Sequence, residues 1–143
     1  MSQTGNNLKD IPILVLDDEA CSVGNIRALL AEIAARLEKL DDHSETGMID
    51  LNTLPLASGE YEQLRQALGQ GEVSARIEAI GASEIIETRY PGVWWVTHYN
   101  VEGDIVADTL EITAIPEIIK SQPEDVRAGL ELLRAQLNNE VQP

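Results

Sequence analysis

The chain has 143 residues and a mass of 15.7 kDa, which suits one domain and leaves little room for two. Hydrophobic residues make up 43% of it and charged residues 24%, a balance that favours folding over disorder. Ten basic against 25 acidic residues give a net charge of −15, which repels phosphate backbones and argues against a nucleic-acid partner. The same charge would attract basic peptides or proteins, and it also serves simply to keep a chain soluble.

Residues that commonly bind metals or perform catalysis are few. Cys21 is the only cysteine, so no intrachain disulfide can form, which fits a reducing cytosol. Cys21 could in principle act as a catalytic nucleophile with His43 or His98 as its base, but the acidic residues at 17–19 oppose formation of the thiolate. No spacing typical of a metal or iron–sulfur site is present. We therefore expect no catalytic residue, no resident metal and no cofactor.

The sequence has no signal for the membrane or for export. No apolar run approaches the roughly 18 residues that span a bilayer, and the first ten residues are too polar for a signal peptide. We expect a cytoplasmic protein without membrane insertion.

The first half of the chain predicts two helices. Ile11–Leu16 is typical of a short edge strand, because Pro12 lacks an amide proton. Ser22 is a candidate N-cap for a helix that runs to Leu40, followed by a polar loop over 41–47. Its apolar residues recur every three or four positions and form one face: Val23, Ile26, Leu29, Leu30, Ile33, Leu37 and Leu40. A second helix is predicted from Ser58 to Gly69, with an inner face of Tyr61, Leu64 and Leu68.

From Glu72 onward the hydrophobic period changes from 3.6 to 2, which indicates strands. Four are predicted, over 72–79, 84–90, 93–99 and 105–112. Turns are expected at Gly81-Ala82, at Pro91-Gly92 and over Asn100–Asp104. These connections are too short for crossover helices, so the strands should form an antiparallel meander.

The chain ends with one helical turn over Ile115–Lys120, opened by Pro116, and an amphipathic helix that frays from Asn138. Val126, Leu130, Leu133 and Leu137 mark the apolar face of that helix. The predicted fold class is therefore α+β: a four-stranded antiparallel meander sheet with two helices before it and one after it. We expect a single domain over 1–143, with 1–10 and 139–143 frayed.

Two local patterns suggest binding or signalling. The segment Ile13–Glu19, which contains Asp17 and Asp18, resembles the first strand of a response-regulator receiver domain, and Asp50 resembles that family's phosphorylated aspartate. Clustered carboxylates of this kind bind Mg²⁺ and accept a phosphoryl group. Four consecutive strands argue against a receiver, however, because receivers alternate strands with helices. An acidic loop that caps a helix explains these residues better.

The aromatic strand Trp94–Tyr99 is the second pattern. Because side chains alternate, Trp94 and Trp95 must lie on opposite faces. Either a core covers both faces, or part of this strand is exposed and anchors a partner. The candidate partner-binding residues are Trp94, Trp95 and Tyr99.

Three segments together carry a resemblance to a known family: Leu51–Tyr61, Leu68–Ala75 and Pro91–Val96. In this order they resemble the HupH/HoxQ/HyaF family of hydrogenase expression proteins, with a family-like core over about 51–120. The resemblance implies a non-enzymatic accessory protein, a chaperone or maturation factor for a nickel–iron hydrogenase. Its implied partners are the small iron–sulfur subunit before export, or other maturation factors. No catalytic residue of the family is carried over.

Family members are typically about twice this length and contain two related domains. A homodimer of this single-domain chain would restore such a pair, because a twofold interface lets one patch serve both subunits. The sheet face that carries part of the Trp94–Tyr99 strand is the candidate patch.

Overall fold

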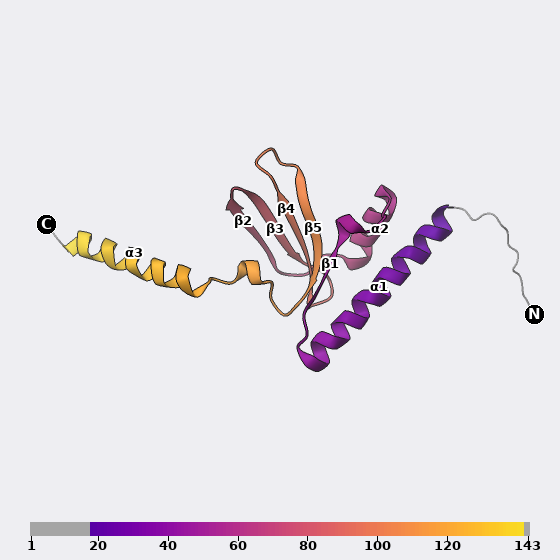
Figure 1. Ribbon diagram of the computed structural model, residues 1–143, viewed down its shortest axis with the longest axis horizontal. Coiled ribbons are helices and arrows are strands. Elements are labelled where there is room, and N and C mark those ends of the chain that lie inside the picture. The colour runs from indigo at the N-terminus through magenta and orange to yellow at the C-terminus, as the bar shows by residue number, and fades with distance from the viewer. Residues whose placement is uncertain (1–17, 142–143) are drawn as a thin grey trace, which may run out of the picture.

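The computed structural model describes residues 18–141, with side chains over 24–139. Three α-helices, two short 3-10 turns and five strands follow one another along the chain (Figure 1). In order they are α1 (Asp18–His43), β1 (Gly47–Asp50), η1 (Leu51–Thr53), α2 (Ser58–Leu68), β2 (Ser74–Ala79), β3 (Gly81–Glu87), β4 (Val93–Tyr99), β5 (Ile105–Ile112), η2 (Glu117–Ile119) and α3 (Pro123–Val141).

The strands form one antiparallel sheet in the order β1-β5-β4-β3-β2. From β2 to β5 each strand pairs with its neighbour in sequence, which confirms the predicted meander. The sheet has five strands rather than the predicted four, because β1 pairs with β5 from Gly47↔Ile112 to Asp50↔Thr109. A strand of four residues is too short to show an alternating pattern, so only its distant partner defines it.

Several predicted boundaries shift. Ser22 is not an N-cap, because α1 already begins at Asp18, and α1 continues to His43 through part of the predicted loop. Strand β3 begins at Gly81 and ends at Glu87, earlier than expected at both ends. Helix α3 continues to Val141, past the expected fraying point. The predicted strand over 11–16 lies outside the described residues.

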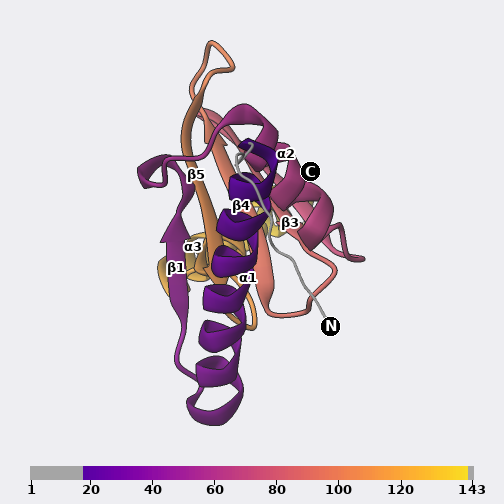
Figure 2. The same cartoon turned by 90° about the vertical axis from the view of Figure 1, so that its right-hand side faces the viewer.

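Helices α1 and α2 cover one face of the sheet, called here the inner face (Figures 1 and 2). The main hydrophobic core lies between them and the strands. It contains Ile26, Leu29, Ile33, Ile49, Leu51, Leu64, Leu68, Val93, Trp95, Leu110 and Ile112. Apart from Trp95, the core residues are aliphatic, as expected for a sequence that contains no phenylalanine.

The two helices are also joined by a charged contact. The Glu60 carboxylate accepts hydrogen bonds from the Ala57 backbone amide and from the Asn25 amide of α1, both at 2.9 Å. The first bond is half of a capping box and closes the amino end of α2. These bonds favour the charged form and lower the pKa of Glu60 below its usual value.

A buried carboxylate connects α2 to the sheet. Asp108 on β5 is 2% exposed and accepts hydrogen bonds from Trp95 Nε1 at 2.7 Å and Thr97 Oγ1 at 2.9 Å. The Tyr61 hydroxyl of α2 donates a third. Tyr61 also meets Trp95 edge to face, with ring centroids 5.3 Å apart, and the Arg65 guanidinium stacks 4.4 Å from the Trp95 ring.

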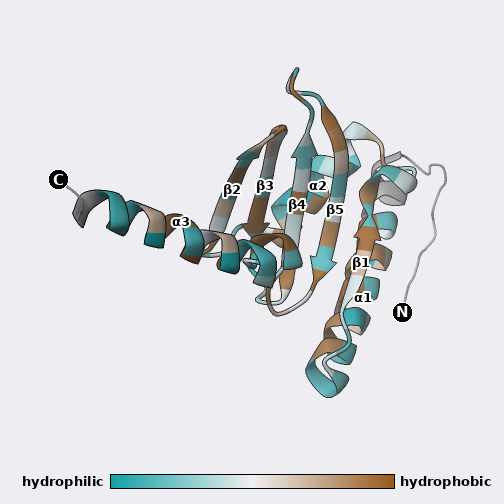
Figure 3. Cartoon of the chain, turned by 60° about the vertical axis from the view of Figure 1, so that its left-hand side comes forward, coloured by the Kyte–Doolittle hydropathy of each residue, from teal (hydrophilic) through white to brown (hydrophobic). Residues whose placement is uncertain are grey.

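The opposite, outer face of the sheet holds a smaller cluster. Ile85, Trp94 and Val96 are buried there, with Ala75, Ile77 and Ile119 packed against them. The chain after β5 covers this cluster, and Trp94 Nε1 donates to the Thr113 carbonyl at 3.0 Å. Helix α3 then leaves the body on this side and points away from the sheet (Figures 1 and 3).

We predict that Tyr61→Phe lowers the free energy of unfolding by about 1–3 kcal/mol, because the buried Asp108 carboxylate loses one of its three donors. Burial and the contact with Asp108 raise the pKa of Tyr61 above its usual value of 10.0. The contribution of Tyr61 to the free energy of unfolding is therefore complete below pH 10, and it is lost as the pH rises through the folded-state pKa. Urea unfolding at pH 8 and at several alkaline pH values measures both effects. The wild type should lose more stability with rising pH than the variant, and parallel pH profiles would contradict the assignment.

Candidate binding surface

Two hairpin ends meet at one end of the sheet. The turn between β2 and β3 places Ile80 at its tip, and the loop over 100–104 joins β4 to β5. Gly81 has a φ of +82°, and a Cβ at this position would lie 2.1 Å from the Tyr99 carbonyl oxygen. Only glycine allows the first turn to lie this close to β4.

The second loop is held by its own hydrogen bonds. Asn100 N donates to the Asp104 carbonyl at 2.9 Å, and Asp104 N donates to Asn100 Oδ1 at 2.9 Å. Gly103, with a φ of +90°, completes the turn. Both hairpin ends therefore present defined positions rather than loose loops.

Large apolar side chains are exposed on these two ends. Ile80 is 94% exposed and Val101 70%, and Ile105 and Val106 are about half exposed. Apolar side chains gathered at one place on a surface are typical of a contact site for another molecule. We call these four residues, with the polar hollow between the hairpins, the tip surface.

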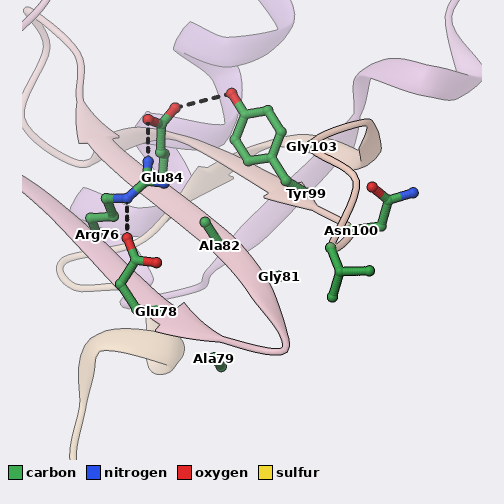
Figure 4. Close-up of a pocket in the computed structure, with 10 residues that line it drawn as sticks. Arg76, Glu78, Ala79, Gly81, Ala82, Glu84, Tyr99, Asn100 and Gly103 are labelled. Atoms are coloured by element: carbon green, nitrogen blue, oxygen red, sulfur yellow. Dashed lines mark hydrogen bonds and ion pairs between the residues drawn. The ribbon is translucent and has the colours of Figure 1, made fainter.

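The hollow has a volume of about 540 Å³ and is open to solvent. Its floor is a chain of charged and polar contacts centred on Glu84 of β3 (Figure 4). Arg76 Nη1 lies 3.0 Å from Glu84 Oε2, and the Tyr99 hydroxyl donates to Glu84 Oε1 at 3.1 Å. Arg76 also pairs with Glu78 on its own strand. Burial, and next the bond to Glu84, raise the pKa of Tyr99, so its hydroxyl remains a neutral donor.

The tip surface is acidic. Glu78, Glu84 and Arg76 line the hollow, and the loop between β4 and β5, which we include in the tip surface, adds Glu102 and Asp104. The sum of these charges is −3. In the described part of the chain, Glu102 and Asp104 have no ion pair. The arrangement can bind a basic group and bury an apolar one beside it.

The structure separates the three residues predicted to bind a partner. Tyr99 lines the tip surface, whereas Trp94 and Trp95 are 5% and 4% exposed. Trp95 belongs to the inner core and Trp94 to the outer cluster, so the chain itself covers both faces of this strand. Sequence reasoning missed Ile80 and Val101. The available signal was an isolated large apolar residue inside a turn, where polar residues are usual.

The two histidines singled out in the sequence, His43 and His98, are not brought together. His98 Nδ1 lies 2.7 Å from Ser83 Oγ on the outer face, whereas His43 ends α1 on the inner side. The side chain of Cys21 lies outside the described side chains. Over residues 18–141, no group of three or more His, Cys, Asp or Glu is arranged to hold a metal ion. In the same range, no helix combines the length and apolar character that a bilayer span requires.

The receiver-domain interpretation is wrong, because the sheet is antiparallel and has no helical crossovers between β2 and β5. Asp50 instead caps η1, since its Oδ1 accepts a hydrogen bond from Asn52 N at 3.0 Å. Asp18 is the first residue of α1. Asp17 lies outside the described residues.

Comparison with known sequences and structures identifies the family. The sequence model of the HupH hydrogenase expression protein, C-terminal conserved region, matches residues 23–139. This chain belongs to the HupH family. A solved structure, the hydrogenase expression protein HupH from Thiobacillus denitrificans ATCC 25259, superposes with a TM-score of 0.78. It is 41% identical, and the match covers 81% of this chain and 97% of that one.

Curated HupH-family relatives are similar over part of their length. The hydrogenase expression/formation protein HupQ of Azotobacter chroococcum mcd 1 is 31% identical, over 83% of this chain and 42% of that protein. The hydrogenase expression/formation protein HupH of Rhizobium leguminosarum bv. viciae is 30% identical, over 77% of this chain and 39% of that protein. This chain thus spans about two fifths of the length of these relatives.

We predict that Gly81→Ala disrupts the tip surface, because the added methyl group collides with the Tyr99 carbonyl oxygen at a positive φ. Gly103→Ala is the matched control. Its φ is also positive, at +90°, but no atom lies within 4 Å of the added carbon. Amide hydrogen exchange should speed up across the β2–β3 turn and the end of β4 in the first variant much more than in the control. Equal changes in both would show that backbone strain alone, and not the close approach, matters at Gly81.

Proposed function

We propose that this protein is a non-catalytic accessory factor for nickel–iron hydrogenase maturation that binds the small iron–sulfur subunit before export. Membership of the HupH family supports the hydrogenase context, and relatives are named hydrogenase expression/formation proteins. Such a factor acts in the cytoplasm, where the unexported subunit is made. The identity of the partner is the step that needs an experiment.

The observation that carries the proposal is the combination of apolar and acidic groups on the tip surface. Its apolar residues are exposed, and its charge is negative within a chain of net charge −15. A complementary segment has arginine or lysine next to an apolar run. Export signals of the twin-arginine class have this composition, so the export signal of the small subunit is the segment that fits.

The contacts assign different tasks to the residues of the tip. Ile80 and Val101 offer apolar contact area to the apolar run of the signal. Glu102 and Asp104 are available to pair with its arginines. Glu84 is already held by Arg76 and Tyr99 and keeps the two hairpins together beneath the bound segment.

The test is binding of a synthetic peptide that contains the paired arginines and the apolar run of the small-subunit export signal. The double variant Glu102→Lys, Asp104→Lys reverses the local charge and should weaken binding at least about tenfold. Wild-type affinity should also fall with rising salt, because exposed ion pairs are screened. Isothermal titration calorimetry of the full chain measures both effects.

The double variant Glu38→Lys, Asp41→Lys is the matched charge control, because it also replaces two carboxylates by two lysines. Both residues are exposed and lie near the carboxyl end of α1, at the end of the molecule opposite the tip (Figure 1). Equal weakening in the control and in the tip variant would show that net charge alone drives binding and would overturn the assignment to the tip. Affinity capture with the full chain from hydrogen-oxidising cells gives the second test. Absence of hydrogenase subunits among the captured proteins would contradict the proposed role.

A further inference from the structure

Helix α3 has an apolar stripe that nothing in the structure covers. Val126, Leu130, Leu133 and Leu137 recur at spacings of four, three and four, so they lie on one side of the helix. Each is about half exposed, and every residue from Pro123 to Asn139 is exposed. Figure 3 shows apolar residues recurring along α3 between hydrophilic ones.

A helix of this kind requires a partner. Isolated helices are marginal in water, and most of their stability in proteins comes from packing of the apolar face. The family match extends to residue 139, so α3 is part of the family's conserved region rather than an appendage. The apolar stripe therefore belongs to a contact that the described part of the chain, residues 18–141, does not complete.

The outer face of the sheet is the complementary surface. Beyond the cluster beneath η2, five neighbouring side chains on this face carry no carboxylate and are partly covered or exposed, and the acidic residues Asp50 and Glu111 lie at their border. We call this the outer patch: Ala79, Ser83, His98, Ala107 and Thr109. An uncharged patch of a sheet face is notable in a chain with 24% charged residues. Its small side chains allow a helix to approach closely, and a half-covered antiparallel sheet is completed by such a layer.

We infer that α3 packs on the outer patch of a second copy of this chain, and that the two copies exchange their α3 helices reciprocally across a twofold axis. The helix cannot reach its own patch in the observed arrangement. It points away from the body, and only the three residues Lys120–Gln122 separate it from η2, which itself packs on the outer face (Figure 1). A second copy can meet the stripe without any change in this connection.

Charges beside the two surfaces are complementary. Arg127 and Arg134 lie seven residues apart along one border of the stripe, and within the described part of the chain neither forms an ion pair. Asp50 faces Thr109 across the β1–β5 pair, and Glu111 lies next to Thr109 on the same face of β5. A docked α3 thus brings two arginines to a sheet face bordered by two carboxylates.

The expected contact area is sufficient for a dimer. A helix of 19 residues is about 28 Å long and its apolar side is roughly 10 Å wide. Each docked helix then removes about 300 Å² from both surfaces, and the two reciprocal contacts together bury about 1,200 Å². That area lies at the lower end of the range for specific, stable interfaces.

The first test is the mass of the full chain by light scattering at micromolar concentration. The wild type should give a mass of about twice 15.7 kDa. The dimeric fraction should be larger at moderate salt, where repulsion between two chains of charge −15 is screened. Leu133→Asp should raise the dissociation constant of the dimer about 100-fold or more. A monomeric wild type at both low and high salt would overturn the inference.

Leu132→Asp is the matched control on the same helix. Leu132 is 73% exposed and lies about 200° around the helix from Leu130, on the side away from the stripe. The control should remain dimeric. Ala107→Arg, on the outer patch, should dissociate the dimer as Leu133→Asp does. A dimer that survives Ala107→Arg but not Leu133→Asp would show that the helices pair with each other instead of with the sheet.

A cross-linking experiment distinguishes exchange from folding back. In a chain that carries Cys21→Ser, Leu133→Cys and Ala107→Cys, mild oxidation should form a disulfide between positions 133 and 107. Dimers assembled from isotopically heavy and light chains then report the partners by mass spectrometry of the linked peptides. Mixed heavy–light links are expected, and links within one chain only would show that α3 folds onto its own sheet.

Discussion

The carboxylate of Asp108 is the contact on which the arrangement of the inner face depends. It lies near the centre of the sheet and receives hydrogen bonds from Trp95, Thr97 and Tyr61. A buried carboxylate is costly unless its oxygens are satisfied. Three donors from two elements satisfy it here, so β4, β5 and α2 must keep one relative position. Tyr99, two residues beyond Thr97 on the same face of β4, is thereby placed at the tip.

The two faces of the sheet are covered to different extents. Two helices cover the inner face, whereas within residues 18–141 the outer face is covered only by the segment after β5 and by η2. The alternation along β4 explains how both faces come to be apolar, since Trp94 and Trp95 lie on opposite sides. In our proposal, the partly covered outer face of one copy and the exposed stripe of α3 from a second copy cover each other.

The tip surface and the outer patch meet at Ala79, which lines the hollow and belongs to the patch, but they serve separate purposes in our proposals. The tip combines carboxylates with exposed isoleucine and valine and is suited to a basic, apolar segment. The outer patch is uncharged and is suited to the leucines of α3. Loss of one contact should leave the other intact, because the Asp108 core between them does not depend on either.

Local patterns in the sequence were enough to determine β4 and β5 at their observed bounds, the second helix, the meander and the apolar stripe of α3. Alternation and helical spacing are local properties, so they can be read without knowing the fold. Three features were decided only by tertiary structure: strand β1, the burial of both tryptophans, and the close approach of the β2–β3 turn to the end of β4 at Gly81 and Tyr99. Asp108 shows the reason most clearly, because its partner Tyr61 is 47 residues away in the chain. Contacts at that separation arise only when distant segments pack together, and a short sequence window cannot contain them.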